Sequence, residues 1–164
     1  MFGSGFLLTS LVWFYLFAVL TIILFLLVPK DEIINLLPFG LLAGFVLALL
    51  LQYFAIHVFK WWKFNYALIK VFNAPLGVSL SWVPAVMIFA YFWPLAISKL
   101  GKLIYVFIFA FGTTIVEYSF VLLGYRKYIN WNVGLTFILA FGIHLLLASY
   151  LYLTTVKDEI YSQK

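Results

Sequence analysis

Five long apolar runs, separated by short clusters of charged residues, divide the chain. Each run is long enough for an α-helix to cross the roughly 30 Å hydrocarbon core of a bilayer. Membrane β-barrels alternate apolar and polar residues instead, and these runs do not alternate. The pattern predicts an all-α polytopic transmembrane bundle in a single domain of 164 residues, with spans at approximately 6–29, 33–57, 78–98, 103–124 and 132–156.

The composition indicates that lipid is the solvent for most of the surface. Hydrophobic residues make up 67% of the chain and charged residues only 9%, which is too little charge for a soluble domain of this size. The net charge of +5 comes from Lys and Arg that flank the spans, so we expect membrane lipids as partners and no nucleic acid. Cysteine is absent, which excludes disulfides and thiolate chemistry.

The segment between the second and third spans, residues 58–77, is mixed rather than apolar. On a helical wheel its lysines occupy a sector of about 80°, and aromatic and aliphatic residues fill the rest. This pattern predicts a short amphipathic helix in the interface; a connecting loop with an aromatic belt is the alternative. With the turn after the fourth span, it provides the candidate anionic-lipid contacts Lys60, Lys63, Lys70, Arg126 and Lys127.

The third span contains Pro84 and Pro94, so we expect it to be kinked, with some backbone carbonyls freed.

The distribution of charge leaves the orientation balanced. With five spans, each face of the membrane carries five Lys or Arg residues, while four of the five acidic residues lie on the face of the C-terminal tail. The positive-inside rule therefore gives a tie, and the acidic residues favour an N-terminus on the inside.

Glu117 is the single carboxylate within a predicted span, about 11 Å below the nearer interface. A carboxylate at that depth faces protein or a water cavity and has a partner. We group it with Gln52, Thr113, Thr114 and His144 as the candidate polar site. A proton or cation site and a hydrogen-bonded packing carboxyl both remain open.

Depth decides which of these polar residues can meet. Gln52 lies about 8 Å deep from the same interface, so it meets Glu117 if the second and fourth helices are neighbours. His144 lies about 18 Å from that interface, and we interpret it as a neutral packing residue.

Small residues mark two predicted helix-packing faces, at four-residue steps in the second span and on one side of the helix, at three- and four-residue steps with polar residues between them, in the fourth. The second span carries Gly40, Gly44 and Ala48, and the fourth carries Ala110 and Gly124. Small side chains allow two helix backbones to approach closely in lipid.

Motifs for catalysis and for metal or cofactor binding are missing from the sequence. It contains no pair of intramembrane aspartates, no His-Glu-x-x-His motif, no Gly-x-Ser-x-Gly elbow and no phosphate-binding loop. His57 and His144 differ in depth by about 18 Å, which argues against a haem between them. We expect no enzymatic activity, no metal and no cofactor.

Residues in and after the fourth span carry a resemblance to a known group of proteins. They are the run Val116-Glu117-Tyr118, then Gly124-Tyr125, Tyr128, Trp131 and Thr136-Phe137. Over residues 80–153 the chain resembles the small uncharacterised membrane proteins of Bacillus-type and other spore-forming Firmicutes. Those proteins often show Ile-Glu-Tyr in the fourth span, and we expect an acidic residue in their third span that is lacking here. The resemblance implies about five spans and a multi-pass location in a bacterial cytoplasmic membrane.

Three functions follow as hypotheses. The first is a non-enzymatic protein that works by association, either with a protein partner in a membrane complex or as a homo-oligomer, through the two packing faces. The second is a small transporter or ion-conducting protein with Glu117 as its coupling residue. The third is binding of anionic lipid at the lysine-rich face.

Overall fold

The structure, a computed structural model, describes residues 9–94 and 98–162, with side chains described as far as Thr154. Most of these residues are helical, which fits the predicted all-α class. Three helical stretches are long and apolar enough to cross a membrane, namely Lys30–Val58, Lys99–Leu122 and Val133–Thr154. The apolar helices Val12–Leu27 and Leu76–Tyr91 are shorter, with 16 residues each. Residues 6–8 and 95–97 of the predicted spans, and 163–164 of the tail, lie outside the described residues.

The chain divides into two compact units. The first consists of Met1–Tyr91 and Ser119–Trp131, and the second of Phe92–Tyr118 and Asn132–Lys164. Each unit is therefore built from two separate stretches of sequence.

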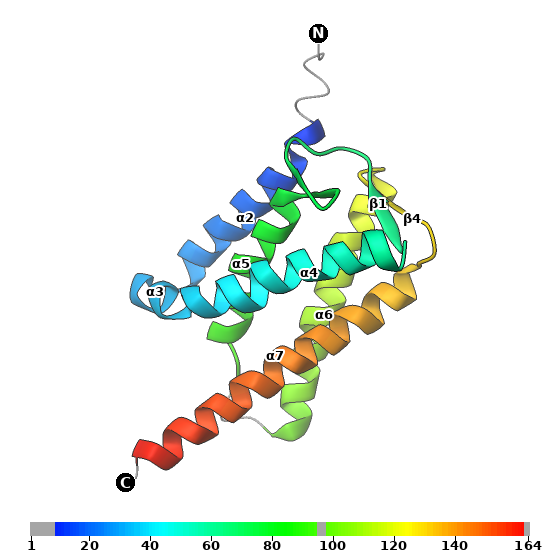
Figure 1. Cartoon of the computed structure of the whole chain (residues 1–164). Helices are drawn as coiled ribbons and strands as arrows, with labels where there is room; N and C mark the ends of the chain where they lie inside the picture. The colour runs from blue at the N-terminus through cyan, green and yellow to red at the C-terminus, as the bar shows by residue number, and fades with distance from the viewer. Residues whose placement is uncertain (1–8, 95–97, 163–164) are drawn as a thin grey trace. The chain divides into compact units, whose positions relative to one another are not determined.

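Helices α2 (Val12–Leu27) and α5 (Leu76–Tyr91) pack side by side in the first unit (Figure 1). A continuous helical stretch contacts α5 as well; it consists of α3 (Lys30–Phe39), η1 (Gly40–Val46), α4 (Leu47–Tyr53) and η2 (Phe54–Val58). Leu24, Val28, Val83 and Met87 form a buried core cluster in this unit. Ile33, Leu36 and Phe45 of the helical stretch between α2 and α5 pack against this cluster.

The segments η1 and η2 are π-helical. Pro38 lies inside α3, two residues before η1, and it has no amide hydrogen with which to continue the regular bonding pattern. After η1, the amide of Leu47 reaches the carbonyl of Leu42, five residues back. The wider π turn accommodates the interruption without ending the helix.

Helix α5 is shorter than the predicted third span of 78–98. It begins at Leu76 and ends at Tyr91, with Pro84 inside it. Pro94 lies after the helix rather than within it, because the residue before a proline is disfavoured in helical conformation. Of the two prolines in the predicted span, only Pro84 lies within the helix.

Two short antiparallel sheets replace the amphipathic helix predicted over 58–77, so that prediction is wrong. Strand β1 (Trp62–Phe64) pairs with β4 (Arg126–Tyr128), and β2 (Lys70–Val71) pairs with β3 (Ala74–Pro75). Lys60, Phe72 and Asn73 have positive φ angles, which a helix does not allow. The strand that pairs with β1 lies about sixty residues later in the sequence. A helical wheel considers only neighbouring residues, so it cannot predict this pairing.

Helices α6 (Lys99–Leu122) and α7 (Val133–Ser162) provide most of the second unit. The side chain of Ser98 accepts a hydrogen bond from the amide of Gly101 at 3.2 Å, and that of Asn132 accepts one from the amide of Leu135 at 2.9 Å. Each polar residue satisfies an amide in the first turn of its helix, as N-cap residues do.

Candidate functional site

The sheet of β1 and β4 separates charged from aromatic side chains. Its register pairs Trp62 with Tyr128, Lys63 with Lys127, and Phe64 with Arg126. Because successive strand residues point to opposite faces, the two lysines share one face and the other four residues share the second. Trp62 and Phe64 are buried, whereas Lys63 and Lys127 are both exposed. The structure therefore holds two lysines directly opposite each other above an aromatic layer.

Arg126, expected as a lipid contact, is buried instead, with only 3% of its surface exposed. Its guanidinium carbon lies 3.9 Å from the centroid of the Trp62 ring, 5.4 Å from that of Phe64 and 5.9 Å from that of Tyr128. A planar guanidinium over an indole face gains cation–π attraction. Arg126 therefore lies on the aromatic face of β4, opposite the face that carries Lys63 and Lys127.

Burial also affects the charge of Arg126. It lowers the pKa of the guanidinium from its ordinary value to about 9, and the neighbouring Tyr128 opposes this shift. The side chain remains protonated at neutral pH, so the cation over the Trp62 ring is present under ordinary conditions.

Gln52 forms a hydrogen bond with the side chain of Trp62. The side chain of Gln52 is buried, and its Oε1 accepts a hydrogen bond from Trp62 Nε1 at 3.0 Å. A residue near the end of α4 therefore positions the indole on which Arg126 stacks.

Replacing Gln52 with leucine should destabilise the protein by about 1–2 kcal/mol, because the buried Trp62 Nε1 loses its acceptor. Unfolding by SDS in mixed micelles, followed by circular dichroism, measures this loss. In a Trp62→Phe background the same Gln52→Leu change should cost less, since no donor remains. Equal costs in both backgrounds would show that the hydrogen bond contributes nothing.

Aromatic contacts join the two segments that carry the strands. The rings of Trp61 and Trp131 stack at 4.1 Å, and Phe59 stacks on Trp61 at 4.6 Å. The amide of Ile129 donates to the carbonyl of Trp61 at 2.8 Å, which extends the pairing beyond the strands. These contacts hold the lysine pair on an ordered support.

Two other predicted lipid contacts lie in the same connecting segment. Lys60 is exposed and has a φ of 52°, and Lys70 is exposed in β2, with Pro75 as its cross-strand partner. Neither has another lysine as its cross-strand partner.

Of the candidate polar site, Thr113, Thr114, Glu117 and His144 belong to the second unit, and Gln52 belongs to the first. Thr114 is buried, and its hydroxyl donates to the carbonyl of Ala110 in its own helix at 2.8 Å. Nδ1 of the buried His144 lies 2.7 Å from the carbonyl of Ala140, and since a carbonyl only accepts, Nδ1 carries the hydrogen. Thr113 and Glu117 are half-buried.

The predicted contact between Gln52 and Glu117 stays a prediction, since the two residues belong to different units.

The small residues of the second span lie against α5. A Cβ atom added at Gly44 would come within 2.7 Å of the carbonyl oxygen of Trp82, and one at Gly40 within 2.7 Å of Met87. Ala48 is buried as well. The face at Gly40, Gly44 and Ala48 is therefore occupied within the chain.

The small residues of the fourth span have different roles. Ala110 is fully buried. Gly124 has a φ of 79° and lies just after the end of α6, and a Cβ added there would meet nothing within 4 Å. Its positive φ is typical of the glycine that ends a helix, so Gly124 is a helix terminator and not part of a packing face.

The juxtaposition of Lys63 and Lys127 was not predicted from the sequence. Both triplets, Trp-Lys-Phe and Arg-Lys-Tyr, place a lysine between two large side chains, a period-two pattern typical of a half-buried strand. Within the part of the chain that the structure describes, no group of three or more His, Asp or Glu side chains gathers to hold a metal. Comparisons with protein-family models, curated proteins and solved structures find no match to this chain.

Proposed function

We propose that the chain is a five-span membrane protein that binds anionic phospholipid headgroups through Lys63 and Lys127. The observation that carries this proposal is the direct pairing of two exposed lysines across β1 and β4. Like charges directly opposite each other on a sheet repel and destabilise the pair. A phosphate between them converts that repulsion into attraction.

The segments that carry Lys63 and Lys127 contain no acidic residue that could pair with them. Residues 58–77 and 119–131 contain no Asp or Glu, so no acidic side chain of either segment neutralises them. Each lysine near an anionic membrane surface contributes about 1 kcal/mol of attraction. Stacked tryptophans beside the pair suit the headgroup level, where aromatic rings with a polar edge are enriched.

Five crossings place both strand-bearing segments on the same side of the membrane. Three helical stretches are long enough to cross a membrane. We propose that the shorter apolar helices α2 and α5 cross it as well. At 1.5 Å per residue their 16 residues cover about 24 Å, which a locally thinned bilayer accommodates. The segment after η2 and the one after α6 then emerge together, as their pairing requires.

Association through the face at Gly40 and Gly44 is less favoured, because α5 already covers it within the chain. A partner would have to displace Trp82 and Met87 to reach it.

The test compares lipid selectivity of the reconstituted full chain by electron paramagnetic resonance of spin-labelled phosphatidylglycerol and phosphatidylcholine. We expect the wild type to prefer phosphatidylglycerol and the Lys63→Gln/Lys127→Gln variant to reduce that preference at least about tenfold, given about 1 kcal/mol per lysine. Lys70→Gln is the matched control, because Lys70 faces Pro75 and no second lysine. It should change the preference much less.

A charge reversal separates lipid binding from support of the sheet. Lys63→Glu creates an opposite-charge pair with Lys127, which should stabilise the sheet by roughly 0.2–1 kcal/mol while reducing the preference for phosphatidylglycerol. If the folded Lys63→Glu and double-glutamine proteins keep the wild-type preference, the proposed function is wrong.

A further inference from the structure

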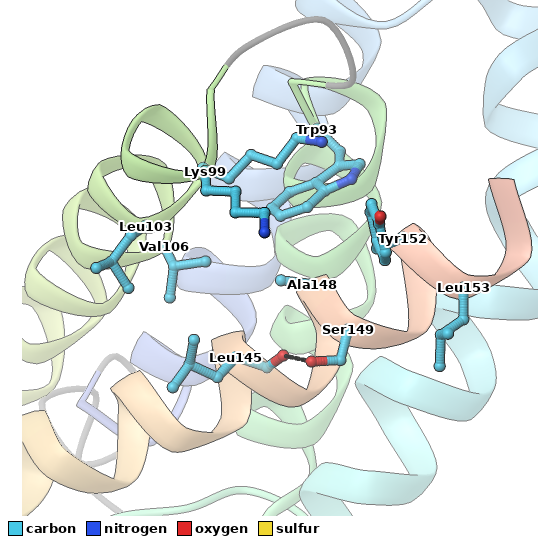
Figure 2. A pocket seen from close by; sticks show the side chains of 10 residues that line it. Trp93, Lys99, Leu103, Val106, Leu145, Ala148, Ser149, Tyr152 and Leu153 are labelled. Carbon is cyan, nitrogen blue, oxygen red and sulfur yellow. Dashed lines mark hydrogen bonds between the residues drawn. The ribbon is translucent and has the colours of Figure 1, made fainter. Parts of the chain in front are cut away.

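The second unit contains a pocket of about 660 Å³ between α6 and α7 (Figure 2). Leu103 and Val106 of α6 face Leu145 and Ala148 of α7 across it. Val106 and Ala148 are buried, whereas Leu103 and Leu145 are more exposed. The volume lies within the range of 300–1,000 Å³ that is usual for ligand pockets, and the floor and walls are apolar.

One end of the pocket carries positive charge. Lys99 and Lys102 both belong to its lining, and none of its described lining residues is acidic. The Nζ atom of Lys102 lies 5.2 Å from the centroid of the Tyr152 ring, a cation–π contact that holds it at the pocket. Figure 2 shows Lys99 beside Trp93 at this same end.

The start of α6 adds to this field. The helix begins at Lys99, so the positive end of its dipole lies where the two lysines are. An anion at this position is attracted by two ammonium groups and by the helix terminus together.

We propose that this pocket binds one anionic phospholipid, with its phosphate between Lys99 and Lys102 and an acyl chain against Leu103, Val106 and Leu145. From Lys99 to Val106 the helix rises about 10 Å, so the pocket takes the headgroup and the first part of the chain. Charge at one end and apolar walls beyond it match the two parts of such a lipid.

This site goes beyond the proposed function and uses different residues. The first site binds headgroups at a surface, and the pocket binds an individual lipid.

Native mass spectrometry of the full chain in detergent, titrated with phosphatidylglycerol, measures the dissociation constant of the first lipid adduct. We expect Lys99→Gln/Lys102→Gln to weaken that adduct at least about tenfold, from two lost lysine contacts. Lys30→Gln removes one exposed lysine in the first turn of α3, away from the lining of the pocket; it is the control and should leave the constant unchanged. Ala148→Phe fills the pocket without altering its charge and should also weaken the adduct.

Two further arms identify the source of the anion. Glycerol phosphate, which has the charge but no acyl chain, should fail to displace the lipid at equal concentration, and phosphatidylcholine should bind more weakly. The proposal is overturned if Lys99→Gln/Lys102→Gln binds phosphatidylglycerol as the wild type does, or if glycerol phosphate displaces the lipid fully. Loss of the adduct in Lys63→Gln/Lys127→Gln alone would assign it to the sheet and also overturn the pocket proposal.

Discussion

Gly44→Ala should destabilise the protein by about 1–3 kcal/mol, the usual cost of forcing an extra methyl group into a packed site. The added Cβ would lie 2.7 Å from the carbonyl oxygen of Trp82 and 3.0 Å from the Cα of Val83. Both are backbone atoms, so no side-chain rotation relieves the clash. The stretch at η1 and helix α5 would have to separate, and the packing around Val83 and Met87 would loosen.

Gly112→Ala is the matched control for this prediction. Gly112 lies inside α6, and a Cβ added there would meet nothing within 4 Å. Alanine in a helix is favoured over glycine by about 1 kcal/mol, so this variant should be as stable as the wild type or more so. Unfolding in SDS mixed micelles, followed by circular dichroism, gives both values. Equal shifts of the two variants would show that η1 does not contact α5 closely.

Arg126→Lys should destabilise the protein by about 2 kcal/mol or more, the value of a desolvated cation–π contact. The substitution keeps the positive charge but loses the planar group that lies 3.9 Å from the Trp62 ring. An ammonium is also more strongly hydrated than a guanidinium, so its burial costs more. The conservative change should therefore be harmful, although it conserves the net charge.

The neighbouring Lys127 provides the comparison. Lys127→Gln removes a charge from the exposed face of the same strand, and it should change the free energy of unfolding by less than about 0.5 kcal/mol. Circular dichroism during SDS titration follows the unfolding of both variants. If Arg126→Lys and Lys127→Gln have the same free energy of unfolding, the stacked arginine does not stabilise the sheet.

The helices were largely predictable from the sequence. Apolar runs flanked by charge predict helices over 33–57, 103–124 and 132–156, because an α-helix satisfies all of its backbone hydrogen bonds within the segment itself. The third helix was predicted too long, since an apolar run continues through Pro94 while the helix stops at Tyr91. Hydrophobic composition predicts which segment forms a helix, whereas the effect of Pro94 on the residues before it determines where this helix ends.

The candidate site was only partly predictable. Lys63 and Lys127 were singled out as charged residues, but their pairing depends on a ladder between residues about sixty positions apart. The sequence likewise grouped Arg126 with the lysines, because charge alone does not show on which face of a strand a side chain lies. The structure shows that Arg126 lies on the other face, where its guanidinium stacks on the buried ring of Trp62.

The division of the first unit between two stretches of sequence has a consequence for how the protein is made. Trp13 packs on Phe120 with ring centroids 4.6 Å apart, and β1 has no partner until β4 exists. Residues 119–131 are synthesised after 92–118, which belong to the other unit. At roughly 5–20 residues per second, the first helices wait several seconds after Tyr91 before their last neighbours leave the ribosome. During that interval the Trp13 ring lacks its contact with Phe120, and β1 lacks its hydrogen-bonding partner.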